Sequence, residues 1–70
     1  MGHNYARPLT PEVRFERLMG RLPADWAIRI EREAGQNWRV WMQPPGREGQ
    51  WSAGHDVLID AMEDVWRAVR

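Results

Sequence analysis

Apolar residues follow two different spacings along the chain, and the first is the spacing of a helix. Between Thr10 and Leu22 they recur three and four positions apart, which places them on one face of a helix. Thr10 is a favourable N-cap residue, Pro11 suits the first helical turn, and Pro23 prevents the helix from continuing. We therefore predict a helix over residues 11–22, with an apolar stripe of Phe15, Leu18, Met19 and Leu22.

From Trp26 onward the spacing becomes two, which is typical of strands with one buried face. Residues 26–31 and 38–43 both alternate in this way, and residues 34–37 between them predict a turn. The two runs predict an antiparallel hairpin whose inward side chains are Trp26, Ile28, Ile30, Trp38, Val40 and Met42. A shorter third strand is expected over residues 50–53, with Trp51 and Ala53 facing inward.

A second helix is predicted over residues 56–69, where the apolar stripe comprises Leu58, Met62, Val65 and Val69. The order of elements predicts an α+β fold with two layers, α-β-β-β-α, in which both helices pack on one face of a three-stranded antiparallel sheet. The other face of the sheet is then open. This single domain covers residues 10–70, and residues 1–9, which have no periodic pattern, are expected to form a flexible N-terminal arm.

The composition restricts how such a chain can work. It has 70 residues, no cysteine and no lysine, and its ten arginines balance ten acidic residues. A chain this short buries a modest share of its surface, so a partner or a second copy can contribute to its stability. No apolar run reaches the roughly 20 residues that span a bilayer. We therefore expect a cytoplasmic protein without a membrane partner.

The chain contains few of the side chains that catalysis requires. The chain has one serine, His3 lies in the expected arm, and His55 has no ligand set at metal spacing around it. His55 and Asp56 are adjacent, and neighbouring residues at the start of a helix rarely face each other. Residues 45–49 form a turn without the following helix of a phosphate loop. We expect a protein that is not an enzyme, has no cofactor or metal, and binds through its surface.

The first candidate surface is the open face of the sheet. If the alternation places Val40 and Met42 toward the helices, Trp41 points outward, beside Arg29 and Arg39. An outward tryptophan among charges is a natural anchor for a partner. The alternative is that Trp41 stacks on a neighbouring guanidinium group or is covered by the arm. We expect Trp41 to be the most exposed of the five tryptophans, with Trp26, Trp38, Trp51 and Trp66 mostly buried.

The second candidate surface is an acidic stripe on the polar side of the last helix, comprising Asp56, Asp60, Glu63 and Asp64. The first helix carries a contrasting row of Arg14, Arg17 and Arg21. Such a stripe either meets a basic groove on a partner or is a solvated helix face, and the sequence leaves both open.

These features favour a small, non-enzymatic protein-binding module. In size and strategy it is similar to the compact inhibitors of phages and other mobile elements, among them anti-CRISPR proteins whose acidic surfaces imitate phosphates and occupy a host nucleic-acid-binding complex. No motif in the chain identifies a family. The partner is then another protein or complex with a basic surface.

Two alternatives stay open. The order of elements is similar to that of the double-stranded RNA-binding domain, but the last helix is acidic where that family is rich in lysine, so nucleic acid is not expected to bind directly. A dimeric structural or regulatory subunit is the other alternative.

Overall fold

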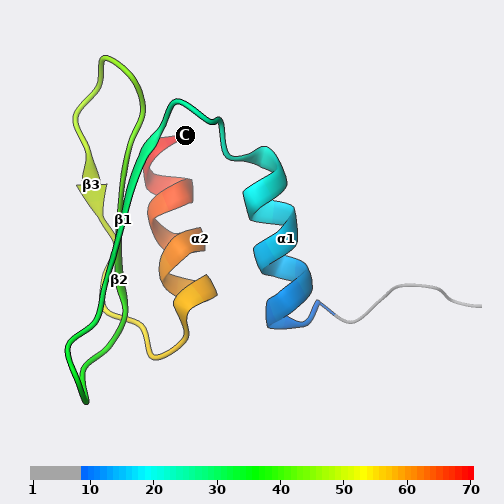
Figure 1. Cartoon of the computed structure of the whole chain (residues 1–70), viewed down its shortest axis with the longest axis vertical. Helices are drawn as coiled ribbons and strands as arrows, with labels where there is room; N and C mark the ends of the chain where they lie inside the picture. The colour runs from blue at the N-terminus through cyan, green and yellow to red at the C-terminus, as the bar shows by residue number, and fades with distance from the viewer. Residues whose placement is uncertain (1–8) are drawn as a thin grey trace, which may run out of the picture.

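The computed structural model describes residues 9–70 of the chain. Its elements follow one another in the predicted order: α1 (Pro11–Arg21), β1 (Ala27–Glu31), β2 (Arg39–Gln43), β3 (Gln50–Trp51) and α2 (Leu58–Val69), as Figure 1 shows. The α+β fold class is confirmed. The predicted N-terminal arm lies outside the described residues except for Leu9, and so does His3.

Helix α1 begins and ends where its flanking residues require. The side-chain oxygen of Thr10 accepts a hydrogen bond from the amide of Val13 at 3.2 Å, which satisfies one of the free amides at the helix start. At the other end Leu22 has an extended backbone, as the following Pro23 demands. Thr10 and Pro23 therefore set the bounds of this helix.

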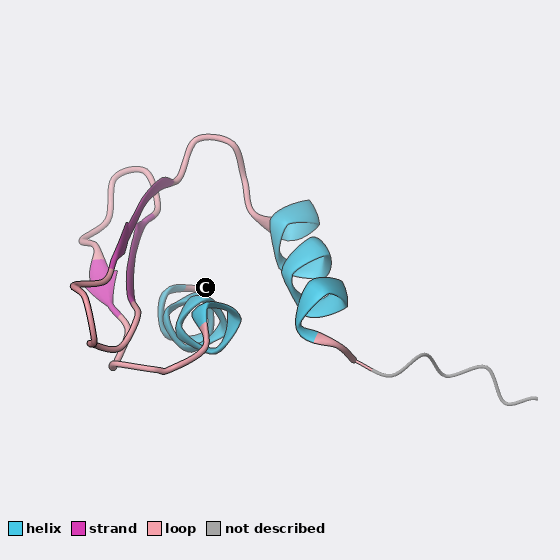
Figure 2. Ribbon diagram, turned by 60° about the horizontal axis from the view of Figure 1, so that its bottom comes forward, coloured by secondary structure: helices cyan, strands magenta, loops and turns pink. Residues whose placement is uncertain are grey.

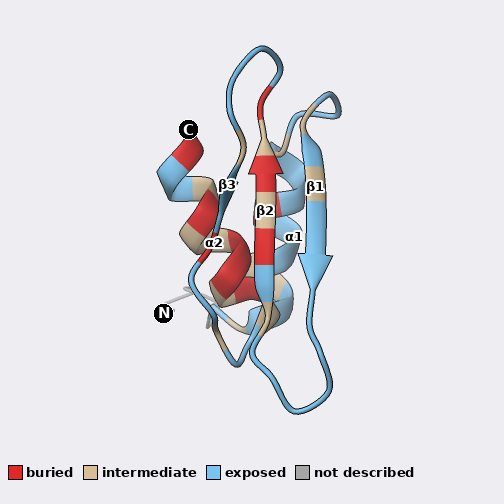
Figure 3. Ribbon diagram, turned by 90° about the vertical axis from the view of Figure 1, so that its left-hand side faces the viewer, coloured by how far each residue is buried: buried red, intermediate tan, exposed pale blue. Residues whose placement is uncertain are grey.

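The three strands form one antiparallel sheet in the order β1-β2-β3, which confirms the predicted hairpin and the third strand. Ile28 lies opposite Met42 and Ile30 opposite Val40, so these four side chains share the face toward the helices. Gly35, at φ 75°, supplies the left-handed residue of the turn between β1 and β2. The central strand β2 is the best-buried strand, with Val40 and Met42 fully covered (Figure 3).

The predicted orientation of the third strand is wrong. Trp51 lies directly opposite Trp41, so both indoles are on the open face, and the side chain that turns inward is the buried Ser52. Ala53, also predicted to face inward, is exposed. The connection between β2 and β3 fixes which residues pair, and the apolar character of Trp51 does not decide its face.

Beyond β3 the pairing continues with one extra residue. An isolated bridge joins Trp38 to His55, whereas the Trp41 and Trp51 register would bring Gly54 opposite Trp38, so the segment contains a β-bulge. The Val40 amide donates to the Ser52 hydroxyl oxygen at 2.9 Å, and the Ser52 amide donates to the Val40 carbonyl at 2.7 Å. The serine side chain thus takes the place of a backbone carbonyl at the bulge.

Helix α2 supplies most of the core. Its buried residues Ile59, Ala61, Met62, Val65 and Val69 pack against β2 and β3. It begins at Leu58, two residues later than predicted, after Val57 as an N-cap without a side-chain hydrogen bond. Asp56 is therefore outside the helix.

Both helices lie on the same side of the sheet, as predicted, but at different distances from it. Helix α1 packs on α2 and lies farther from the sheet than α2 does (Figures 1 and 2), with no Cα atom within 8 Å of a strand. Leu18 is the one residue of α1 that is buried, while Phe15 and Met19 are 39% and 43% exposed. On the helix side of β1, Ile30 remains 47% exposed because no helix covers it.

Candidate functional site

The open face of the sheet carries a group of two tryptophans and two arginines, which we call the Trp-Arg cluster: Arg29, Arg39, Trp41 and Trp51. The rings of Trp41 and Trp51 have their centroids 6.5 Å apart and are tilted by 47°. The guanidinium carbon of Arg29 lies 5.4 Å from the Trp41 centroid, and that of Arg39 lies 4.8 Å from the Trp51 centroid. Both arginines are exposed and within the range of a cation–π interaction.

This arrangement follows from strand pairing. Arg29 pairs with Trp41 across β1 and β2, and Trp41 pairs with Trp51 across β2 and β3, so the three side chains form one row across the sheet. Arg39, two residues from Trp41 on the same strand, is the diagonal neighbour of Trp51. The structure therefore brings together Trp41, Arg29 and Arg39, as the alternation indicates, and adds Trp51, which the alternation missed.

The predicted exposure ranking of the tryptophans is also wrong. Trp51 is 37% exposed, whereas Trp41 is only partly exposed. The ring of Trp41 lies against the backbone of Gly49, so closely that a Cβ atom at this glycine would come within 2.2 Å of the ring. The end of the loop between β2 and β3 therefore covers Trp41, and this contact is possible because residue 49 has no side chain.

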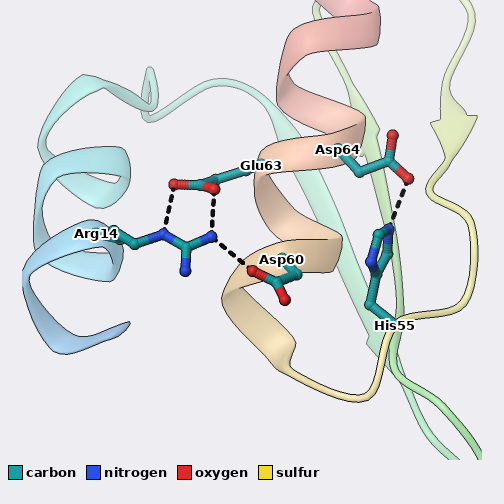
Figure 4. Close-up of polar contacts among 5 residues, drawn as sticks. All are labelled: Arg14, His55, Asp60, Glu63 and Asp64. Carbon is teal, nitrogen blue, oxygen red and sulfur yellow. Dashed lines mark hydrogen bonds and ion pairs between the residues drawn. The ribbon is translucent and has the colours of Figure 1, made fainter. Parts of the chain in front are cut away.

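The acidic residues of α2 are not a free stripe. Arg14 of α1 donates from Nη2 to Asp60 and to Glu63, both at 2.6 Å, and from Nε to the second oxygen of Glu63 at 3.2 Å (Figure 4). The hydrogen bond from Arg14 holds the pKa of the Glu63 carboxyl below its usual range, and Glu63 and Asp60 in turn raise the pKa of Arg14. Two of the four predicted carboxylates thus hold the helices together.

Asp64 points toward the segment before α2 instead of toward α1, and it has its own partners. One of its oxygens accepts from the Ala53 amide at 2.9 Å and lies 3.0 Å from His55 Nε2 (Figure 4). These hydrogen bonds lower the pKa of the Asp64 carboxyl, and the contribution of His55 is larger than that of the Ala53 amide. Asp56 is exposed in the bend before α2, so the four acidic residues point in three directions.

Ser52, His55 and Asp64 are neighbours, but their hydrogen bonds do not form a nucleophile with its base. The Ser52 hydroxyl donates to the Ala53 carbonyl at 2.8 Å and accepts from the Val40 amide. His55 points its Nε2 at Asp64. The hydroxyl therefore serves the strand backbone and not the histidine.

Residues 9–70 contain no group of three or more His, Cys, Asp or Glu side chains that could hold a metal ion. Over the same residues, neither helix has the length and apolar character needed to cross a membrane. No protein family, no curated protein and no solved structure matches the chain.

Proposed function

We propose that this protein is a non-catalytic protein-binding module that contacts its partner through the Trp-Arg cluster on the open sheet face. One observation carries the proposal: Trp51 and Trp41 lie side by side on a face that no helix covers, each with a guanidinium group beside its ring. Tryptophan and arginine are the residue types most enriched among interface residues that dominate binding energy.

The geometry suits a protein surface that combines apolar and acidic residues. The two indoles supply large, rigid contact areas that lose little conformational entropy on binding. The stacked guanidinium groups are held in place by the rings, yet they keep their N–H groups available for carboxylates. A partner with an apolar side chain flanked by Asp or Glu would therefore engage both components of the cluster.

The acidic residues of α2 offer weaker support for a docking surface. Arg14 already forms ion pairs with Asp60 and Glu63, and Asp64 already has hydrogen-bond partners in His55 and the Ala53 amide. A basic partner would have to displace these contacts before it gained its own. Imitation of phosphates by this helix is therefore less favoured than contact through the open face.

A second candidate function, binding of single-stranded nucleic acid, is favoured by the same tryptophan pair. Bases stack on exposed aromatic rings, and arginines contribute phosphate contacts and cation–π interactions. Against this candidate, the rings are tilted by 47° and each already has a guanidinium group beside it. Bases would have to compete with those groups.

The test begins with capture of a partner from the native host and continues with the purified partner. We expect Trp51→Ala to raise the Kd of the complex with this partner by about 30-fold or more, because a tryptophan at the centre of an interface contributes at least about 2 kcal/mol to the binding free energy. The matched control is Phe15→Ala, which removes an aromatic side chain of similar exposure from α1, on the helix side of the sheet. This control should change Kd by less than about twofold, as a residue outside the contact surface does.

Equal binding by the parent and Trp51→Ala would remove the open face as the contact surface. Two further measurements separate the alternatives. A parent dimer that Trp51→Ala converts to a monomer would identify a second copy as the occupant. Submicromolar binding of single-stranded oligonucleotides that is lost in Trp51→Ala would replace the protein partner with nucleic acid.

A further inference from the structure

A separate surface on the helix side of the molecule concentrates positive charge. A groove of about 200 Å³ runs between α1 and the last turns of α2, and four of the arginines around it are Arg17, Arg21, Arg67 and Arg70. Leu18 and Trp66 contribute apolar surface to the same groove. We call this feature the arginine groove. It is independent of the Trp-Arg cluster and of the function proposed for that cluster.

The four arginines are exposed, and Arg67 lies near enough to Glu63 and Asp64 for its charge to contribute to the lowered pKa of both carboxyls. No hydrogen bond or ion pair within residues 9–70 involves the side chains of these four arginines, whereas Arg14 nearby donates from Nε and Nη2 to Glu63 and Asp60. One carboxylate, Glu63, lines the groove, and Arg14 already holds both of its oxygens. The chain as a whole has zero net charge, so the positive charge of this groove is a local accumulation.

Helix geometry explains why these side chains share one surface. Arg17 and Arg21 are four residues apart on α1, and Arg67 and Arg70 are three residues apart at the end of α2, so each pair lies on one helix face. Arginine near a helix C-terminus is favoured because that end carries about half a negative charge. Two helix ends thus offset about one of the four positive charges. Arg14 with Asp60 and Glu63 carries one further net negative charge beside the groove, so a surplus of about two positive charges remains available to a ligand.

The shape and chemistry of the arginine groove select its ligand. A guanidinium group presents its N–H donors in a planar fork that matches the oxygens of phosphate and can form two hydrogen bonds at once. A volume of about 200 Å³ is below the roughly 300 Å³ of sites that enclose a whole small molecule. The groove can therefore hold a charged group, while the rest of the ligand lies over Leu18 and Trp66.

From these observations we infer that the arginine groove between α1 and α2 is a binding site for phosphate groups. The phosphate group can belong to either of two ligands, a small phosphate compound or the backbone of a nucleic acid strand. In either case Arg17 and Arg21 approach the phosphate oxygens from one helix and Arg67 and Arg70 from the other. Arg14 also lines the groove, but its Nε and Nη2 donate to Glu63 and Asp60, whose charges offset its own.

The experiment titrates the full chain with inorganic pyrophosphate at low salt, by calorimetry and by amide and indole chemical shifts. Arg17→Gln combined with Arg67→Gln removes one arginine from each helix. We expect this variant to bind pyrophosphate at least about tenfold more weakly than the parent, since each lost charge-assisted contact is strong. The parent's shifts should be largest at Leu18 and at the Trp66 indole, both of which line the groove.

The matched control is Arg32→Gln combined with Arg47→Gln, which removes the same charge from the two loops of the sheet. It should bind pyrophosphate within about twofold of the parent, since neither residue lines the groove. Melting temperatures of all three proteins show whether they are equally folded.

A parallel titration with a single-stranded oligonucleotide separates the two sources. For a nucleic acid strand, the oligonucleotide should bind more tightly than pyrophosphate, and the slope of log K against log salt should fall by about 0.7 for each arginine removed. For a small phosphate compound, pyrophosphate should bind at least as tightly as the oligonucleotide. No binding of either probe at millimolar concentration, or equal loss of binding in both double variants, would overturn the assignment.

Discussion

Gly49 shows how a single absent side chain shapes the open face. The Trp41 ring occupies the space where a Cβ atom of residue 49 would be, and the nearest ring atoms would lie 2.2 to 2.5 Å from it. Real side chains do not approach this closely, so any other residue at this position would force the indole to move. Gly49 therefore decides how much of Trp41 is offered to a partner.

We expect Gly49→Ala to lower the free energy of unfolding by about 1–3 kcal/mol, the usual cost of overpacking. Displacement of the indole should also change its fluorescence. The control is Gly20→Ala: Gly20 is within α1, and a Cβ atom added there would meet no other atom within 4 Å. Alanine is the better helix former, so this control should raise stability by about 0.5 kcal/mol. Chemical denaturation measures both changes, and an unaltered Gly49→Ala stability would show that Trp41 does not rest on Gly49.

Among the elements, α1 is the least firmly attached. It packs on α2, none of its Cα atoms lies within 8 Å of a strand, and its anchors are Leu18 in the core and the ion pairs of Arg14 with Asp60 and Glu63. Phe15 and Met19 of its apolar stripe remain substantially exposed. Few buried contacts make local opening easy, so α1 can separate from α2 at a lower cost than unfolding of the sheet.

Arg14→Met tests this attachment, because methionine keeps most of the aliphatic length and removes the charge. We expect the free energy of unfolding to fall by about 1 kcal/mol, which is at the upper end for partly exposed ion pairs, because the guanidinium group binds two carboxylates. Hydrogen exchange should accelerate in α1 and remain slow in β2. Arg17→Met is the matched control one turn away, and it should leave both quantities unchanged because Arg17 has no acidic partner within residues 9–70. Similar effects of the two substitutions would contradict the proposed role of the ion pairs.

The sequence predicts most elements and fails where tertiary contacts decide. The alternation in β1 and β2 and the flanking residues of α1 predict the hairpin and the first helix to within one residue. The face of Trp51 could not be predicted, because it depends on the pairing that the loop after β2 imposes. The partners of the acidic residues could not be predicted either, since they come from α1 and from the segment before α2.

Helix and strand periodicity predicts which face of its own element each side chain of the candidate site occupies. It does not show which other element lies against that face. Trp41, Arg29 and Arg39 follow from the alternation of two strands. The arginine groove joins residues that are about 50 positions apart in the chain. This groove forms where α1 packs against α2, and the spacing of apolar residues does not specify that contact.

At the scale of the whole molecule, stability should depend on pH through Glu63 and Asp64. In the folded state the pKa of each carboxyl is lowered, mainly by Arg14 for Glu63 and by His55 for Asp64, from ordinary values of 4.5 and 3.8. A group with a lowered pKa stabilises the fold above its ordinary pKa, and this contribution is lost as the pH falls through the folded-state value. Acidification therefore weakens the α1 contact and the contact of the His55 segment together.

We expect the melting temperature to stay nearly constant from about pH 7 to pH 5 and to fall below about pH 4.5. Glu63→Gln combined with Asp64→Asn should be less stable than the parent at neutral pH and should approach it as the pH falls through the lowered folded-state pKa values, where the parent's carboxyls become protonated. Calorimetry over this range measures both curves. A constant difference between them at every pH would exclude these two carboxyls as the source of the acid sensitivity.

The β-bulge after β3 determines which face His55 occupies. Successive residues of a strand point to opposite faces, so with regular pairing beyond Ser52 the side chain at position 55 would point to the open face, away from α2. The extra residue reverses this direction, places His55 opposite Trp38, and brings it to Asp64. The number of residues between Ser52 and His55 therefore determines whether His55 can reach Asp64 and link the sheet to α2. This number is as important for the link as the identity of either residue.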